Sequence, residues 1–563
     1  MRSSTSSVRS DRPVRVVLIG YGPVGARLVE HLLPGVAGGE LELTVVGAED
    51  EDAYNRVLIG EYAVGRADRD GLEITDTPAA RAAGVRIRTA EVAVSIDRDR
   101  QCVRTSIGAD VPYDRLVLAT GSRPNIPRLA GLELVGRAPD APPSRDPAAL
   151  DRGASRRPSG VLALRDLGDA EALKAGLRAG GRLVVLGAGV LGMEIALAAR
   201  DEGAAVSIVH PGETPMAGAL DRDGGLMLAR AARMAGVDVI PHAVAESVSV
   251  RQTGRGAQFR GLVCADGTFV GGDLLVVSCG VRPRIELAHR AGLDTEFGIL
   301  VEPDLRTWAD PDIFAIGDCA HVAPADSAGS DGRVGGAPAG LIAPGWRQAE
   351  ALAARLVAQA RGDEELGQQP AAPRAPVVML KARGVDLVAG GVVDADPWDS
   401  GGREVAQWLD PTRGRYVRAV SRGGVLDGFV AVGAPRAGAE LTLLLERGSS
   451  LPADPATVLH LDREGQDVGA QTGHDAATVC WCNGVSIGGV ERAVADGAST
   501  VECVGRATRA GTGCGGCRGR IAEVLLRLTE PRPEGAAPAQ PGVAERGVAA
   551  PTSAEPALAS VET

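Results

Sequence analysis

Four cysteines near the end of the chain have the spacing of a metal site. Cys480 and Cys482 form a C-x-C pair, and Cys514 and Cys517 form a C-x-x-C pair. Thiolates are soft, strongly donating ligands, so four of them suit an iron–sulfur cluster or a structural zinc ion. Zinc more often uses two C-x-x-C pairs, so the C-x-C pair favours the cluster and leaves zinc as the alternative.

The other five cysteines carry no such pattern. We expect them to be buried thiols, because cysteine is among the residues most often buried and these lie in or near apolar segments. They are Cys102, Cys264, Cys279, Cys319 and Cys503.

A glycine-rich loop near the start has the spacing that a dinucleotide requires. Gly20, Gly22 and Gly25 lie where an apolar run at 14–20 passes into a predicted helix at 23–33. Glycine allows a tight turn and a close approach to a pyrophosphate, which the free N–H groups of the helix then face. Glu49 stands at the end of the next predicted strand, where an acid can accept hydrogen bonds from ribose hydroxyls.

The same pattern recurs in the middle of the chain. Gly187, Gly189 and Gly192 again separate an apolar strand from a helix. The following strand ends at His210 instead of an acid, although Glu213 stands three residues later. We predict that His210 contacts the nucleotide, with a surface histidine at a strand end as the alternative. An acid favours NAD and a nearby arginine favours NADP, so this pattern favours NADH only weakly.

Composition and charge exclude several classes of protein. The 60 basic and 72 acidic residues give a net charge of -12, which argues against nucleic acid or an anionic membrane as the main partner. No apolar run reaches the roughly 18 residues of a membrane span, and the polar N-terminus lacks an apolar signal core. We therefore expect a cytoplasmic protein.

The remaining segments differ in composition. Pro-, Arg- and Asp-rich residues at 136–160 predict an inserted surface loop, and 321–338 predict a second polar insertion. Residues 361–376 are expected to form a linker. Short strand-like runs with glycine turns at 377–465 predict a small α+β domain.

Several motifs resemble the pyridine nucleotide–disulfide oxidoreductase superfamily. Residues 119–124 (ATGSRP) match its loop between nucleotide domains, 307–318 (TWADPDIFAIGD) its second flavin motif, and 343–349 (APGWRQA) its helix start near the flavin. The resemblance implies FAD at the first glycine loop and NAD(P)H at the second. It also implies that Thr120, Gly121 and Asp318 contact the FAD, Asp318 at its ribityl chain.

One departure from that superfamily narrows the expected activity. No redox cysteine pair lies between Gly25 and Cys102, so electrons are not expected to reach a protein disulfide there. Residues 54–58 (YNRVL) instead resemble the Y-[ND]-R stretch of the ferredoxin-reductase and nitrite-reductase branches, which implies that Arg56 lies against the FAD. Gly60 stands where relatives often have serine.

The cysteine-rich end resembles a second family. C-x-C-N at 480–483 and TGCGGC at 512–517 are similar to the [2Fe–2S] domain of bacterioferritin-associated ferredoxins. The resemblance implies a [2Fe–2S] cluster on Cys480, Cys482, Cys514 and Cys517, with a short helix and turn between the pairs. We further predict that Glu194 lies near the nicotinamide–flavin contact, with a helix N-terminal acid as the alternative.

These parts together predict an α/β protein of four domains. They are two Rossmann-like dinucleotide-binding domains, for FAD (14–135 with 270–360) and for NAD(P) (155–269), a small α+β domain (377–465) and a small helical [2Fe–2S] domain (475–529), flanked by disordered residues 1–13 and 530–563.

The order of modules resembles the nitrite reductase large-subunit branch and the electron-transfer subunits of assimilatory nitrate reductases. It implies an NAD(P)H-dependent oxidoreductase that delivers single electrons to a nitrate or nitrite reductase catalytic subunit. No cysteine follows Cys517, so we do not expect this chain to reduce nitrite itself. A stand-alone reductase of a small electron carrier such as ferredoxin or rubredoxin, a bacterioferritin partner and a non-catalytic redox sensor are the alternatives, and a homodimer is left open.

Overall fold

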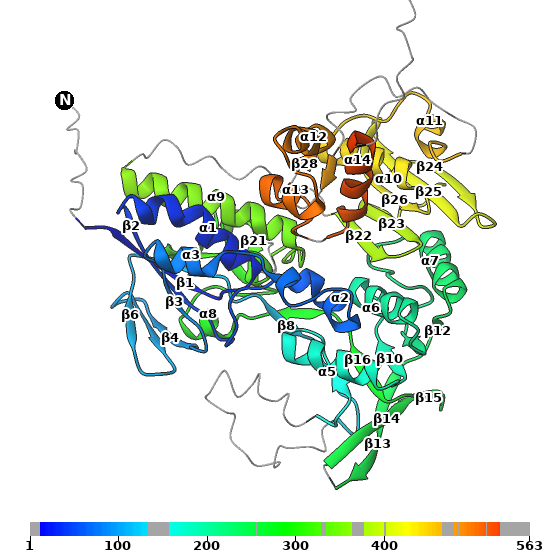
Figure 1. Cartoon of the computed structure of the whole chain (residues 1–563), viewed down its shortest axis with the longest axis horizontal. Helices are drawn as coiled ribbons and strands as arrows, with labels where there is room; N and C mark the ends of the chain where they lie inside the picture. The colour runs from blue at the N-terminus through cyan, green and yellow to red at the C-terminus, as the bar shows by residue number, and fades with distance from the viewer. Residues whose placement is uncertain are drawn as a thin grey trace, which may run out of the picture.

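The computed structural model describes residues 12–132, 157–254, 256–327, 334–362, 377–398, 401–463, 478–480, 485–513 and 515–529 (Figure 1). The predicted disordered tail at 530–563 lies outside these residues. So do nearly all of the predicted disordered N-terminus, most of the loop at 136–160 and nearly all of the linker at 361–376.

The first dinucleotide unit is built on an eight-stranded sheet of order β21-β18-β19-β20-β7-β1-β2-β3. Its central strands pair in parallel, which suits their apolar sequences because both faces are covered. The strands are β1 (Val14–Ile19), β2 (Leu41–Val46), β3 (Arg86–Arg88), β7 (Arg115–Leu118), β18 (Ile299–Val301), β19 (Arg306–Thr307), β20 (Asp310–Ala315) and β21 (Ala320–Val322).

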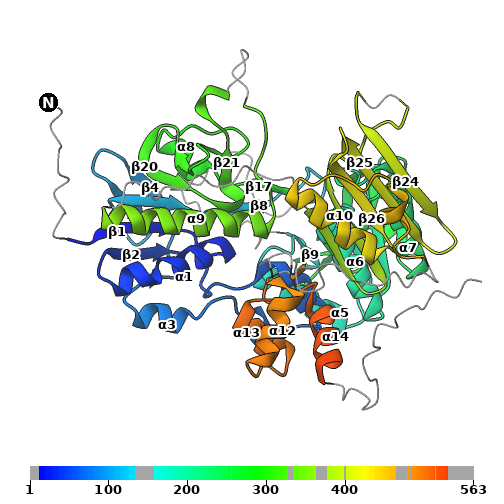
Figure 2. The ribbon, with the colours of Figure 1, turned by 90° about the horizontal axis from the view of Figure 1, so that it is seen from above.

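Helices cover one face of this sheet and a small antiparallel sheet covers the other (Figure 2). The helical face is formed by α1 (Pro23–Ala37), α3 (Thr77–Ala82) and α9 (Ile342–Arg361). The opposite face is covered by β4 (Ala93–Asp97), β5 (Cys102–Thr105), β6 (Asp110–Pro112) and α8 (Glu286–Arg290). A 3-10 turn, η1 (Arg56–Leu58), and α2 (Ile59–Val64) extend toward the second unit.

The second dinucleotide unit has a five-stranded parallel sheet of order β12-β11-β10-β16-β9. Its strands are β9 (Val161–Leu162), β10 (Leu183–Leu186), β11 (Val206–Val209), β12 (Asp238–Ile240) and β16 (Leu274–Val277). One face packs on α5 (Leu167–Arg178), α6 (Val190–Asp201) and α7 (Arg222–Met234), and the other on β13 (Ala245–Thr253), β14 (Gly256–Cys264) and β15 (Phe269–Gly271).

The predicted boundary at residue 270 is wrong by about one strand. Strand β16 begins at Leu274 but pairs with β10 of the second unit, between β10 and β9. The chain returns to the first unit only afterwards, through β17 (Val281–Pro283), which pairs with β8 (Ser122–Pro124) on the outward crossing. An apolar strand of this length fits either parallel sheet, so its sequence did not show which one it joins.

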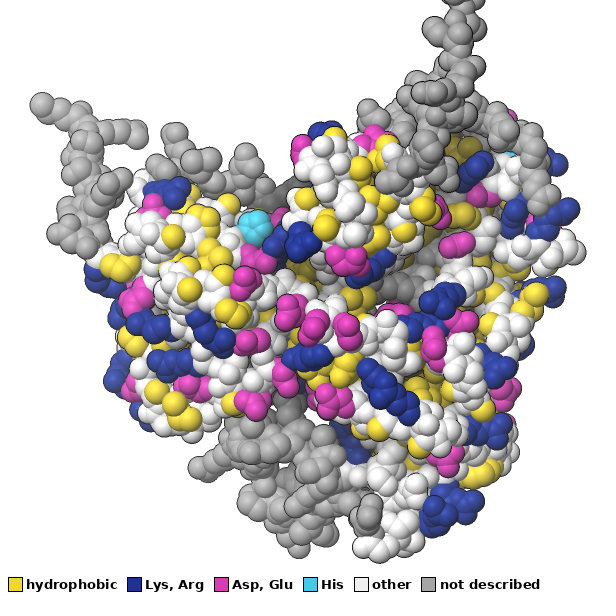
Figure 3. Space-filling view, in the orientation of Figure 1, with side chains coloured by type: hydrophobic (Ala, Val, Ile, Leu, Met, Phe, Trp, Pro, Cys, Tyr) yellow, Lys and Arg dark blue, Asp and Glu magenta, His cyan; other side chains and the backbone are white. Residues whose placement is uncertain are grey.

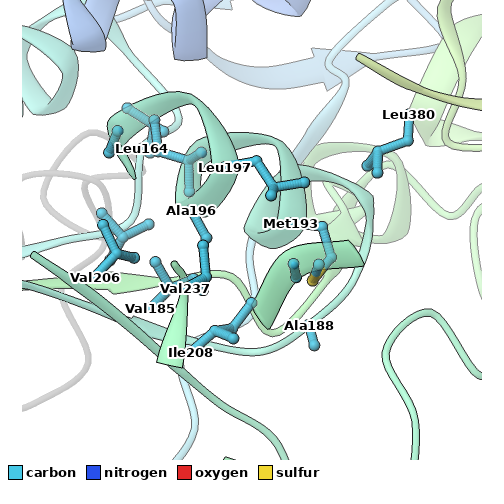
Figure 4. Packing of buried hydrophobic residues seen from close by; sticks show 14 of the residues in the cluster. Leu164, Val185, Ala188, Met193, Ala196, Leu197, Val206, Ile208, Val237 and Leu380 are labelled. Carbon is cyan, nitrogen blue, oxygen red and sulfur yellow. The ribbon is translucent and has the colours of Figure 1, made fainter. Parts of the chain in front are cut away.

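A third sheet packs on the second unit instead of standing apart. Its five antiparallel strands, of order β22-β23-β26-β25-β24, carry α10 (Pro435–Arg447) and α11 (Ala456–Leu459) on one face. The other face adds Leu380, Tyr416 and Val430 to the apolar core of α6 and α7. Figure 4 shows Leu380 beside Met193 and Leu197 of α6. The strands are β22 (Val377–Ala382), β23 (Val385–Gly391), β24 (Glu404–Asp410), β25 (Arg415–Arg422) and β26 (Val425–Val432).

A small helical domain completes the described chain. It contains the hairpin β27 (Thr478–Cys480) and β28 (Val485–Ser486), with α12 (Ile487–Ala495), α13 (Val501–Thr508) and α14 (Arg518–Thr529) around one apolar core. The predicted short helix is α12, and α13 was not anticipated. The α/β class, the two Rossmann-like units, the α+β domain and the helical domain are therefore confirmed.

A buried polar cluster joins the third sheet to α7. The Tyr416 hydroxyl donates to Asp221 Oδ2 at 2.5 Å, and Arg418 Nη1 lies 3.8 Å from the same oxygen. Asp221 also caps α7 by accepting from the Gly224 N–H. Burial raises the pKa of Asp221, and the Tyr416 hydroxyl and Arg418 oppose that rise. The third sheet thus supplies the two side chains that compensate the buried carboxylate.

We predict that Arg418→Met lowers stability by roughly 3 kcal/mol, because it leaves Asp221 buried without its cation. Urea unfolding followed by tryptophan fluorescence measures the effect. Arg422→Met is the matched control on the same strand, since the Arg422 side chain is 58% exposed. Equal unfolding midpoints for the two variants would contradict the prediction.

Candidate functional site

The first glycine loop is shaped by close backbone approaches. Gly20 has a φ of +107°, and a Cβ there would lie 2.1 Å from the Ala119 carbonyl oxygen. A Cβ on Gly25 would lie 2.3 Å from the Gly20 carbonyl oxygen. A Cβ on Gly22, the N-cap of α1, would have Arg56 Nε as its nearest neighbour, at 3.8 Å. No side chain caps this helix. The first and third glycines therefore fix the turn, and the middle one faces open space.

The second glycine loop repeats this division of roles. Gly187 has a φ of +106°, and a Cβ there would lie 2.2 Å from the Ser278 carbonyl oxygen. A Cβ on Gly192 would lie 2.0 Å from the Gly187 carbonyl oxygen, whereas one on Gly189 meets no described atom within 4 Å. Gly189 is the N-cap of α6 and makes no side-chain cap. Both loops thus leave the N–H groups at a helix start without a side-chain cap, which is the arrangement that suits an anionic pyrophosphate.

Glu49 is held by two side chains of the segment that follows it. The Tyr54 hydroxyl donates to Glu49 Oε2 at 2.9 Å, and the Arg56 guanidinium pairs with Glu49 Oε1. Arg56 also donates to the Arg165 carbonyl oxygen at 3.0 Å and stacks over the Tyr54 ring. Burial raises the pKa of Tyr54, so its hydroxyl remains a donor. The structure therefore brings Glu49 and Arg56 together, beside the first glycine loop.

Asp318 lies in a polar group that joins both crossings between the units. It stands in the 3-10 turn η4 (Gly317–Cys319) after β20 and accepts from Ser122 Oγ at 2.6 Å and Arg165 Nη2 at 3.2 Å. Burial lowers the pKa of Arg165, and Asp318 opposes that change. Thr120 donates to the Arg284 carbonyl oxygen at 2.8 Å.

Two members of this group were not singled out from the sequence. Ser122 lies within the quoted ATG loop, so its position was available. Arg165 lies in the second unit, 153 residues from Asp318, and no local motif marks it. Gly121, with a φ of +68°, allows the chain to turn between Thr120 and Ser122.

His210 is not a surface residue, which removes the alternative considered for it. Its side chain is buried at the end of β11, and Nε2 has no hydrogen-bond partner among the described residues. Burial, assisted by His242 and Arg233, lowers its pKa, so the ring is neutral near pH 7. Glu213 is exposed and pairs with Arg222 at 2.6 Å. Contact between His210 and the nucleotide remains a prediction.

Glu194 is the fifth residue of α6, beyond its first turn, and is half-buried. Helix α6 packs against α2, and a Cβ at Gly60 of α2 would lie 3.9 Å from Ile195, the next residue of α6. Glu194 is therefore on the helix that faces the first unit. Its place beside a nicotinamide–flavin contact stays a prediction.

Two of the four predicted cluster ligands are described. Cys480 ends β27 and Cys517 immediately precedes α14, and both are buried in the core of the helical domain. Cys482 and Cys514 lie outside the described residues. Both cysteines belong to one apolar core although they come from distant parts of this domain, and thiolates are the ligands that iron–sulfur clusters use.

The five remaining cysteines differ in exposure. Cys102, Cys264 and Cys319 are buried as expected. Cys279 and Cys503 are only partly buried. At Cys503 the expectation was wrong, because α13 places it toward the surface, where Thr500 and Arg506 lower the pKa of its thiol.

The residues between α13 and α14, here called the cluster loop (509–517, with Cys514 not described), lie against Tyr54–Leu58, here called the anchor segment. Asn55 Nδ2 donates to the carbonyl oxygens of Thr512 at 2.9 Å and Gly513 at 2.5 Å. A Cβ on Gly515 would lie 3.0 Å from Leu58 Cδ2. Arg509 pairs with Glu30 of α1 at 2.7 Å.

Comparison with known families decides the classification. Residues 14–339, more than half of the chain, match the family described as pyridine nucleotide-disulphide oxidoreductase. The chain belongs to this family. Residues 478–527 match the BFD-like [2Fe-2S] binding domain. An NAD(P)H-dependent flavoprotein oxidoreductase with FAD and a [2Fe-2S] cluster is thereby shown, which removes the non-catalytic sensor as an alternative.

Individual members of the family extend the likeness to the C-terminal domains. The chain is 30% identical over 520 residues to the NADH nitrite reductase large subunit of Escherichia coli, covering 91% of this chain and 55% of that protein. It is 28% identical over 518 residues to the assimilatory nitrate reductase electron transfer subunit of Bacillus subtilis, covering 92% and 60%. The chain thus spans only half to three fifths of these relatives.

A solved structure supports the fold of this oxidoreductase. The covalent putidaredoxin reductase–putidaredoxin complex aligns with a TM-score of 0.64 at 24% identity, covering 80% of this chain and 96% of that one. None of the helices in the described part of the chain has the length and hydropathy that crossing a bilayer requires. On the face seen in Figure 3, basic and acidic side chains are interspersed, without a continuous basic surface.

We predict that Gly189→Ala raises the KM for NAD(P)H roughly tenfold, about 1.4 kcal/mol, with little change in Tm. The added methyl group meets no described atom but projects into the space expected to hold the pyrophosphate. Steady-state kinetics and thermal unfolding measure the two effects. Gly254→Ala, in the turn between β13 and β14 and equally open, is the control. A KM equal to that of the control would contradict this assignment.

Proposed function

We propose that this oxidoreductase is the electron-input component of an assimilatory nitrate or nitrite reductase. When bound, FAD accepts a hydride from NAD(P)H, and the [2Fe–2S] cluster passes electrons on one at a time. In balance, one NAD(P)H is oxidised to NAD(P)⁺, one proton is released and two one-electron acceptors are reduced. The cytoplasm, where NAD(P)H is available, is the proposed location.

The contact between the cluster loop and the anchor segment supports this proposal most directly. In the anchor segment, Tyr54 and Arg56 donate hydrogen bonds to Glu49, the acid predicted to bind the ribose. Asn55, between them, donates to the backbone just before Cys514. The predicted flavin and cluster sites therefore share one short segment of chain. Such closeness is what internal electron transfer requires, and an iron–sulfur domain serving only as a structural support has no need of it.

The chain's own residues divide the remaining work. Gly20, Gly22 and Gly25 with Glu49 and Arg56 are proposed to bind the FAD nucleotide, and Thr120, Gly121 and Asp318 to orient its other end. Gly187, Gly189 and Gly192, with His210, are proposed to bind the nicotinamide nucleotide, and Glu194 to lie at its reacting end.

The neutral His210 favours NADH in this proposal. A neutral ring offers no positive charge to the 2′-phosphate of NADPH. Arg222, a nearby arginine, is already paired with Glu213. Cys480, Cys482, Cys514 and Cys517 are proposed to ligate the cluster, and the acceptor is proposed to be a nitrate or nitrite reductase catalytic subunit.

Anaerobic titration with NADH, followed by flavin absorbance and cluster EPR, tests this function. We expect the flavin band to bleach and a reduced-cluster signal to appear. Cys514→Ser is expected to abolish that signal and electron delivery to the catalytic subunit while sparing NADH-dependent dye reduction.

Cys503→Ser is the matched control, because Cys503 belongs to the same domain but lies outside the ligand set. Loss of dye reduction together with the EPR signal in Cys514→Ser would assign the cluster a structural role and overturn the proposal. Delivery to a ferredoxin or rubredoxin but not to the catalytic subunit would replace the proposed partner by a small electron carrier.

A further inference from the structure

Asn55 is a buried polar side chain that links two segments 457 residues apart. It is 1% exposed, and its amide nitrogen donates to the carbonyl oxygens of Thr512 and Gly513. Such a side chain is costly to bury unless its groups are paired, and here both the donor and the acceptor side are satisfied.

The local backbone fixes which way the amide points. Asn55 is the N-cap of η1, and its Oδ1 accepts from the Val57 N–H at 3.0 Å. The opposite orientation would place Oδ1 against two carbonyl oxygens, so the hydrogen-bond pattern itself assigns the orientation. The turn thus aims the NH₂ group of Asn55 at the cluster loop.

The contacts around Asn55 differ in how firmly they hold that loop. The Arg509–Glu30 pair lies nearer the surface, with the arginine side chain 43% exposed, and exposed ion pairs contribute little. Leu58 contacts Gly515 through dispersion, which is not directional. Among these contacts, only the Asn55 hydrogen bonds are both buried and directional, and they bind the residues immediately before Cys514.

We propose that Asn55 is a positioning residue for electron transfer between the flavin and the cluster. It holds the cluster loop at a fixed place on the anchor segment, whose Tyr54 and Arg56 hold Glu49 in the predicted FAD site. This role rests on the proposed function. Asn55 would thereby set the distance between the residues that would hold the FAD and those that would hold the cluster, without itself taking part in electron transfer.

Asn55→Asp isolates the donor role in the fully loaded protein. At pH 8 an ionised aspartate still accepts from the Val57 N–H, but it has no proton to donate and faces two carbonyl oxygens. We expect flavin reduction by NADH to stay within about twofold of wild type, since the contacts to Glu49 come from Tyr54 and Arg56, and positions that share no partner usually act independently. Reduction of the cluster should slow by roughly tenfold to a hundredfold, the range that misplacement by about 1 Å can cost.

Stopped-flow absorbance and freeze-quench EPR resolve the two steps, and amide hydrogen exchange gives a readout without turnover. Exchange in 509–513 should rise in the oxidised variant while α12 keeps its protection. Asn125→Ala is the matched control, because Asn125 also donates to a backbone carbonyl, that of Cys279, away from the cluster loop. Asn55→Ala removes donor and acceptor together and must slow the same step.

The outcomes separate this inference from the proposed function. Wild-type rates of cluster reduction in Asn55→Asp and Asn55→Ala would overturn it, as would slowing of equal size in Asn125→Ala. Loss of iron from the Asn55 variants would also overturn it, because the contact would then serve cluster assembly. Failure of NADH to reduce the flavin in the unaltered protein would instead remove the proposed function.

Discussion

The docking of the cluster loop on the anchor segment is the constraint on which the functional interpretation depends. The hydrogen bonds of Asn55, the Arg509–Glu30 pair and the contact of Leu58 with Gly515 place the C-terminal domain on the first dinucleotide unit. They give the C-terminal domain a defined position against α1 and the anchor segment. With them, the predicted flavin and cluster sites lie on either side of an anchor segment of only five residues.

At the junction between the two dinucleotide units, one residue likewise makes several of the contacts. Arg165 leaves the second unit to reach Ser122 and Asp318 of the first, and its carbonyl oxygen accepts from Arg56. A single residue thus connects the ATG loop, the second flavin motif and the anchor segment. Burial lowers the pKa of Arg165, and Asp318 opposes that change.

The sequence predicted features that depend on a few consecutive residues, but not the contacts between residues far apart in the chain. Both glycine loops were predictable because a turn, a close approach and a helix start impose fixed spacings over six residues. The spacing of the cysteine pairs indicated the [2Fe-2S] domain for the same reason. The Arg165–Asp318 and Asn55–Gly513 contacts were not, since no periodicity encodes which distant segments meet. The burial of His210 was not predictable either, since β12, which pairs with β11 just before it, comes almost thirty residues later in the sequence.

The shared core of the second unit and the third sheet bears on how such proteins can be recombined. Tyr416 and Val430 pack with residues of α6 and α7, and Asp221 draws its compensation from across that boundary. The third sheet is therefore not an independent module, although a separate stretch of chain after the two dinucleotide units forms it. In a chimaera that combined this sheet from one protein with α6 and α7 from another, the side chains at their interface would not match. Evolution is thus expected to have transmitted the two together, while the cluster domain, with its smaller contact, was freer to be gained or lost.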